Sequence, residues 1–243
     1  SEMCIRDRNV PSYIAADAKI KRAVNDLIVS KSFDNGMICA SEQAAIVDSE
    51  VYDEVKAEFE AHQCYIVSKK SELEKLENVV INEAKTAVNP KIVGYSAEYI
   101  ADLAGIKVPK GTKILLAEIP DAGPDYPLSR EKLSPVLALI KSEGVEDALE
   151  KCEKMLDLGG LGHTAVIHTT DEDLQIEFGI RMKACRILVN SPSAVGGIGN
   201  IYNEMIPSLT LGCGSYGHNS VSHNVGALDS VSYTHLTLPT ILR

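Results

Sequence analysis

The stretch that decides the fold is residues 162–190, GHTAVIHTTDEDLQIEFGIRMKACRILVN. It contains two short apolar runs, 163–169 and 186–190, on either side of a mixed segment, 171–184, that has the length of a helix. Short apolar runs next to turn signals are typical of buried strands, and a strand–helix–strand unit makes its two strands parallel through a right-handed crossover. The stretch therefore predicts an α/β fold built on a mostly parallel sheet.

The same alternation extends towards both ends of the chain. Asp17 is the expected N-cap of the first helix, Ser71 and Glu74 form a possible capping box, and Gly105 is expected to end a helix. The Gly-, Ser- and Asn-rich chain after residue 190 is expected to be loop. Expected helices lie at 17–33, 51–62, 71–84, 96–105 and 145–160, and expected strands at 44–48, 65–68, 112–119 and 134–141.

The two ends of the chain do not resemble the protein between them. Codons can be chosen for residues 1–8, SEMCIRDR, and for residues 230–240 so that the two coding sequences contain reverse-complementary copies of the same DNA sequence. That shared sequence resembles the transposon end used to prepare sequencing libraries. We therefore expect residues 1–8 and 230–243 to be adapter-derived and residues 9–229 to be the genuine segment, cut from a longer gene.

Composition limits the possible partners. The net charge is −10, and it becomes −11 when the two acidic and three basic residues of the ends are removed. An acidic chain without a Lys/Arg run argues against nucleic acid and anionic membranes, and no apolar run approaches the length of a membrane span. Five cysteines remain without Cys4, an odd number with no CxxC pair, which favours a reduced cytoplasmic protein over a disulfide framework or a metal site.

Cys39 is the sharpest candidate for chemistry. It lies in SFDNGMICASEQ, three residues after Gly36, in a short loop between a helix and a strand at the sheet edge where ligands are expected. A glycine there leaves room for a substrate next to a nucleophilic thiol. From the residues alone, a cysteine next to Met37 and Ile38 is more often a small buried hydrophobic side chain than a nucleophile. Cys152 and Cys185 are expected in the core, whereas Cys213 could line a site or belong to a tight turn.

Five segments together carry a family resemblance. They are KSFDNGMICASEQ (31–43), EKLSP (131–135), GGLGHTAVIHT (159–169), RILVNSPSAVGGIG (186–199) and PSLTLGCGSYGHNS (207–220). In this order they resemble the catalytic half of the CoA-acylating aldehyde dehydrogenases, and most closely the aldehyde dehydrogenase part of bifunctional aldehyde–alcohol dehydrogenases. Because Asn35-Gly36 stands where hydrolytic members have a Gly-Gln pair, the CoA-dependent branch is favoured.

The resemblance implies roles for particular residues. Cys39 would be the nucleophile that forms a thiohemiacetal and then a thioester, and His163 would steer CoA or transfer protons. Glu131 would bind the ribose next to the nicotinamide, although a loop carboxylate paired with Arg130 or Lys132 is the alternative. Leu133 would pack against the nicotinamide, and Gly212, Cys213 and Gly214 would approach the substrate. His163 could instead be structural, and no metal site is implied.

The resemblance also implies partners and missing parts. NAD and CoA would serve to interconvert acetaldehyde and acetyl-CoA, and the complete protein would form homo-oligomers. The cofactor domain would be incomplete, since its phosphate-binding loop would precede Asn9, so residues 9–229 alone should be nearly inactive. An iron-dependent alcohol dehydrogenase could follow Asp229. The alternatives are a hydrolytic aldehyde dehydrogenase, a thiol acyltransferase, or a non-catalytic assembly module.

Overall fold

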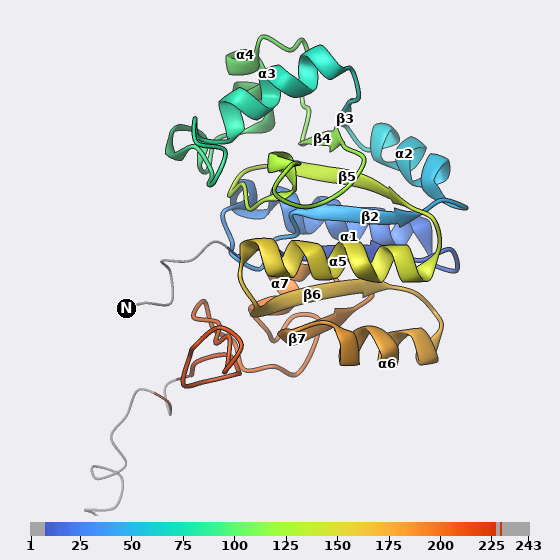
Figure 1. Cartoon of the computed structure of the whole chain (residues 1–243), viewed down its shortest axis with the longest axis vertical. Coiled ribbons are helices and arrows are strands. Elements are labelled where there is room, and N and C mark those ends of the chain that lie inside the picture. Colours follow the sequence, from blue (N-terminus) through green and yellow to red (C-terminus); the bar gives the residue numbers. More distant parts are fainter. Residues whose placement is uncertain (1–7, 227–228, 230–243) are drawn as a thin grey trace, which may run out of the picture.

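A computed structural model describes residues 8–226 and 229 of the chain (Figure 1). Of the expected adapter-derived segments 1–8 and 230–243, residues 1–7 and 230–243 lie outside the described residues, whereas Arg8 is described and buried. The strands are β1 (Pro11–Ile14), β2 (Ala44–Asp48), β3 (Cys64–Val67), β4 (Ile114–Glu118), β5 (Val136–Ser142), β6 (Gly162–His168) and β7 (Ala184–Val189).

Helices connect most of these strands. The α-helices are α1 (Ile20–Ser32), α2 (Tyr52–Ala61), α3 (Lys70–Val80), α4 (Ala97–Ala104), α5 (Val145–Gly159), α6 (Glu172–Arg181) and α7 (Ser193–Gly197). Single 3₁₀ turns are η3 (Pro90–Ile92) and η4 (Pro127–Ser129), and η2 (Phe33–Gly36) is a turn that contains left-handed residues.

The described strands form one seven-stranded sheet in the order β3-β4-β5-β2-β1-β6-β7. Every neighbouring pair in it is parallel, as the strand–helix–strand pattern predicts. Helices α3 to α6 cover one face and α1 and α2 cover the other (Figure 1). Because both faces are covered, central strands such as β2 are buried along their whole length and read as continuous apolar runs.

The sequence pattern missed one central strand. β1 lies between β2 and β6, but its four residues, PSYI, are too few to show a period. Its proline stands at the first position, where the missing N–H is tolerated best. Helix α7 was also missed, since five residues, SAVGG, have no helical signature and were expected to be loop.

Three local expectations were wrong. The N-cap of α1 is Lys19, and Asp17 instead accepts hydrogen bonds from the hydroxyl groups of Thr169 and Thr170 after β6. Ser71 lies inside α3, whose N-cap is Lys69, so the capping box does not form. Cys185 is half-buried in β7, not in the core. The expected stop at Gly105 is confirmed, because it caps α4 in the left-handed conformation.

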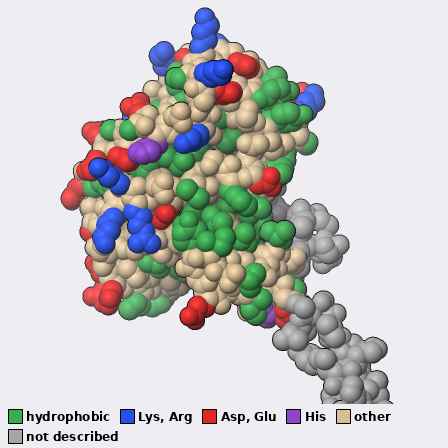
Figure 2. Space-filling view, turned by 180° about the vertical axis from the view of Figure 1, so that it is seen from behind, with side chains coloured by type: hydrophobic (Ala, Val, Ile, Leu, Met, Phe, Trp, Pro, Cys, Tyr) green, Lys and Arg blue, Asp and Glu red, His purple; other side chains and the backbone are tan. Residues whose placement is uncertain are grey.

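Charged side chains are intermixed on the molecular surface. Figure 2 shows acidic and basic groups side by side on the face turned away in Figure 1, together with a hydrophobic patch. Within residues 8–226 and 229, no helix is long and apolar enough to cross a bilayer.

Candidate active site

The candidate nucleophile is carried by a tight turn. Asp34, Asn35 and Gly36 have φ values of 49°, 49° and 72°, so three consecutive residues are left-handed. Asn and Asp tolerate this conformation better than other residues with a side chain, and glycine tolerates it best. The Asn35 amide donates a hydrogen bond of 2.9 Å to the carbonyl of Gly94, which ties the turn to a neighbouring loop. Cys39 follows this turn and is half-buried.

The site lies at the edge of the sheet that is formed by the amino ends of the strands. Cys39 comes five residues before β2, residues 131–133 come just before β5, and His163 is the second residue of β6. A loop that runs from a helix into a parallel strand reaches the strand at its amino end. Ligand sites of open parallel sheets usually lie outside the carboxyl ends of the strands, where loops leave the strands, whereas this loop enters one.

Cys39 and His163 are in direct contact. The His163 Nε2 atom lies 3.2 Å from the Cys39 Sγ atom, although 124 positions separate the two residues. On the other side of the ring, Nδ1 lies 2.9 Å from the Thr164 hydroxyl oxygen. Burial, together with the positive charges of Arg186 and Arg8, lowers the pKa of His163 to about 3. The imidazole is therefore neutral at physiological pH.

Arg186 in β7 is a buried charge that the sequence argument missed. Its guanidinium donates hydrogen bonds to the His163 carbonyl at 3.1 Å, to the Thr164 hydroxyl at 3.2 Å and to the Gly212 carbonyl at 3.0 Å. It also donates to the Asn224 side chain at 3.0 Å. An arginine in the otherwise apolar run RILV was the signal available, because a buried charge requires partners.

The segment Gly212–Gly214 lies against the start of β6. A Cβ atom at Gly162 would lie 2.2 Å from the Cys213 carbonyl oxygen, so the two backbones are in close contact. The Cys213 side chain is 1% exposed, and burial raises the pKa of its thiol. Gly214 has a φ of 55°, and Gly217 donates to the Cys213 carbonyl in a tight turn. The turn interpretation of Cys213 is thus observed, and contact of Gly212, Cys213 and Gly214 with substrate stays a prediction.

Glu131 and Leu133 lie next to the nucleophile loop. Glu131 is buried, and its negative charge acts on the ammonium groups of Lys31 and Lys132. Leu133 is half-buried with a φ of 41°, and its carbonyl accepts a hydrogen bond from Gly94, the residue that also binds Asn35. The structure thus brings both predicted cofactor-binding residues to the side of the site that carries Cys39.

A network of buried polar side chains stabilises the loop that carries Cys39. Glu42 accepts hydrogen bonds from the Ser30 hydroxyl and, at 2.8 Å, from the Ser193 backbone N–H. Burial raises the pKa of Glu42 to about 7 and lowers the pKa of Lys31 to about 7. The network joins α1, the nucleophile loop and α7. Sequence reasoning missed it because the partners come together only in the folded chain.

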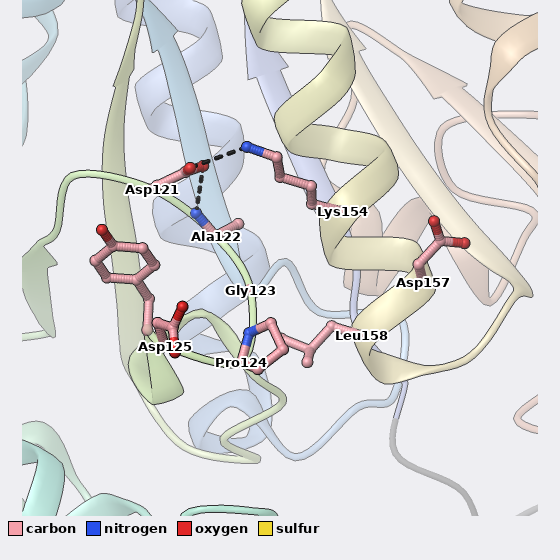
Figure 3. Close-up of a pocket in the computed structure, with 9 residues that line it drawn as sticks. Asp121, Ala122, Gly123, Pro124, Asp125, Lys154, Asp157 and Leu158 are labelled. Carbon is pink, nitrogen blue, oxygen red and sulfur yellow. Dashed lines mark hydrogen bonds and ion pairs between the residues drawn. The ribbon is translucent and has the colours of Figure 1, made fainter.

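A hollow in the surface lies away from this site (Figure 3). The loop 121–126 and the end of α5 line it, and Lys154 reaches across to Asp121 at 2.9 Å. None of its lining residues belongs to the set around Cys39. Across the described residues, no three His, Cys, Asp or Glu side chains gather as a metal site requires.

Comparison with known proteins identifies the family. A model of the aldehyde dehydrogenase family matches residues 9–200. The chain belongs to the aldehyde dehydrogenase family. It is 52% identical over 228 residues to an aldehyde-alcohol dehydrogenase of Streptococcus pneumoniae, which covers 91% of this chain and 26% of that protein. This confirms the resemblance seen in the five sequence segments.

Solved structures of aldehyde dehydrogenases have the same fold. An acetylating aldehyde dehydrogenase from Geobacillus thermoglucosidasius matches with a TM-score of 0.86 and 42% identity, covering 95% of this chain and 49% of that one. A Rhodopseudomonas palustris propionaldehyde dehydrogenase with bound propionyl-CoA matches with a TM-score of 0.74 and 25% identity, covering 88% of this chain and 46% of that one. The chain thus spans about half the length of these aldehyde dehydrogenases and about a quarter of the aldehyde-alcohol dehydrogenase.

Proposed function

We propose that this chain is the catalytic part of a CoA-acylating aldehyde dehydrogenase that interconverts acetaldehyde, CoA and NAD with acetyl-CoA and NADH. The observation that carries the proposal is the 3.2 Å contact between Cys39 Sγ and His163 Nε2. Both residues lie within the segment 9–200 that matches the aldehyde dehydrogenase family. Relatives named as acetylating enzymes favour a CoA thiol over water as the acyl acceptor.

Cys39 performs the covalent steps. Its thiolate attacks the aldehyde carbonyl, forming a C–S bond and placing the negative charge on oxygen as a thiohemiacetal. Loss of hydride from this carbon gives a thioester, and the CoA thiolate then attacks the thioester and releases the Cys39 thiolate with formation of acyl-CoA. Sulfur suits both steps because it is a good nucleophile and a good leaving group.

The residues present fit a nicotinamide cofactor beside Cys39. Glu131 offers a carboxylate that can accept hydrogen bonds from two ribose hydroxyls, and Leu133 offers apolar contact. Both are held next to the nucleophile loop, through the hydrogen bond from Gly94 to Leu133 and that from Asn35 to Gly94. When bound, the nicotinamide supplies the hydride acceptor.

The wider setting belongs to the same proposal. The complete protein is expected to be a cytoplasmic homo-oligomer acting on small molecules, and residues 9–229 alone should show little turnover because the chain spans about half the length of the related acetylating enzyme. The genomic sequence on both sides of these codons tests the proposed boundaries. A continuous reading frame in which residues 1–8 are encoded as given would contradict them.

The decisive experiment substitutes Cys39 in the complete enzyme. Cys39→Ala should abolish oxidation of NADH with acetyl-CoA, whereas Cys185→Ala, a half-buried thiol in β7, should leave most of the activity. Undiminished turnover of Cys39→Ala would overturn the assignment. Formation of free acetate instead of acetyl-CoA from acetaldehyde would favour the hydrolytic alternative.

A further inference from the structure

We propose that Thr164 is a positioning residue that holds neutral His163 with its proton on Nε2, so that the ring donates a hydrogen bond to the Cys39 sulfur. The inference rests on the proposed role of Cys39 as nucleophile. It concerns which atom of the histidine carries the proton, which the family assignment leaves open.

The contacts of the Thr164 hydroxyl decide the direction of the bonds. Arg186 can only donate, so the hydroxyl oxygen accepts its hydrogen bond at 3.2 Å. The other contact of that oxygen is His163 Nδ1 at 2.9 Å. Thr164 is fully buried. If Nδ1 carried the proton, the hydroxyl would accept two hydrogen bonds and its own hydrogen would have no acceptor among these contacts.

An unsatisfied buried hydroxyl is unfavourable, so the Thr164 hydrogen points to Nδ1 and Nδ1 accepts. A neutral imidazole whose Nδ1 accepts must carry its hydrogen on Nε2. The ring is neutral because it is buried and its surroundings are a thiol, a hydroxyl and the guanidinium group of Arg186, none of which stabilises a positive charge on it. The chain of bonds runs from Arg186 through Thr164 and His163 to Cys39.

The donor and acceptor roles in these hydrogen bonds determine what His163 does in the reaction. Nε2–H donates to sulfur, so the ring does not take the thiol proton, which leaves to solvent before attack. The hydrogen bond stabilises the Cys39 thiolate before it attacks the aldehyde and again when CoA displaces it from the thioester. The imidazole keeps its proton through both steps.

The test reads the tautomer directly. In the full chain labelled with ¹⁵N-histidine, two-bond ¹H–¹⁵N correlations distinguish Nε2–H from Nδ1–H, and His163→Gln assigns the signals. We expect Nε2–H in the unmodified chain. Nδ1–H there would overturn the proposal, so the outcome does not depend on whether any Thr164 variant folds.

Variants of Thr164 extend the test. Thr164→Val should allow the Nδ1–H form and slow the alkylation of Cys39 about fivefold, the equivalent of one lost hydrogen bond, while Thr164→Ser should retain both properties. Thr169→Val is the matched control, since Thr169 lies beyond β6 and binds Asp17. An unchanged tautomer and alkylation rate in Thr164→Val would also overturn the proposal. Failure of the proposed function would appear separately, as turnover by the complete Cys39→Ala enzyme.

Discussion

A Cβ atom at Gly36 would lie 2.5 Å from the carbonyl oxygen of Ser134, which places the nucleophile turn in close contact with the loop that carries Glu131. Gly36 also has a φ of 72°, which is unfavourable for residues with a side chain. We therefore expect Gly36→Ala to lower the free energy of unfolding by about 2 kcal/mol or more, because strain and overlap with backbone add. Urea unfolding of the variant and the unmodified chain measures the difference.

Gly105 provides a control for the strain alone. It has a φ of 64°, but nothing lies within 4 Å of the position of its Cβ atom. Gly105→Ala should therefore cost about 1 kcal/mol, the conformational part only. Equal losses for the two variants would show that the contact with Ser134 contributes nothing.

Limiting alkylation should modify Cys39 before the other thiols. Cys39 is half-buried and contacts the His163 ring. Burial raises the pKa of the Cys64 thiol to about 12 and also raises the pKa values of Cys152 and Cys185. Peptide mass spectrometry after treatment with substoichiometric iodoacetamide near neutral pH gives the order. Labelling of Cys152 or Cys185 first would favour a structural role for Cys39.

The parallel sheet could be predicted because buried parallel strands leave a local signal. The predicted strand at residues 44–48 agrees with β2 (Ala44–Asp48), since each of its residues is buried between two helical layers. β1 gave no such signal, because four residues with Pro11 and Ser12 do not form a recognisable apolar run. Its central position becomes visible only through its pairing with β2 and β6.

The candidate site was predictable only where a short motif carried it. Cys39 and His163 stand in recognisable segments, but their contact joins positions 124 residues apart. Thr164, Arg186 and Glu42 were missed, because their importance comes from partners on other elements and not from neighbours in the sequence. Likewise, the spacing of Ser71 and Glu74 suggested a capping box, but the local pattern did not determine where α3 begins.

Ser30 connects the nucleophile loop to α7 and should be important for stability. Its hydroxyl donates to Glu42 and accepts a hydrogen bond of 2.7 Å from the Ala194 backbone N–H. Ser30→Ala leaves both groups buried without this partner, so we expect a loss of about 1–3 kcal/mol in the free energy of unfolding. Urea unfolding measures it.

Ser32→Ala in the same helix is the matched control. Ser32 is exposed, and its hydroxyl donates only to the Ile28 carbonyl one turn back. Alanine has a higher helix propensity than serine, so the effect should stay within about 0.5 kcal/mol. If the two variants lost equal stability, the link from Ser30 to α7 would have no particular energetic role.

His168, the last residue of β6, should make the chain less stable in acid. Burial, with a further contribution from Arg22, lowers the pKa of His168 from 6.5 to about 4. The unfolded chain therefore binds one more proton than the folded chain between about pH 4 and about pH 6.5, and stability is lost as the pH falls through this range. The loss for this group in the free energy of unfolding is on the order of 3 kcal/mol.

His168→Leu should remove that part of the pH dependence, as measured by urea unfolding at about pH 4.5 and about pH 7. Because Glu42, Lys31 and His163 titrate in both proteins, the difference between the two pH slopes isolates His168. Parallel slopes would show that His168 is not buried in its neutral form.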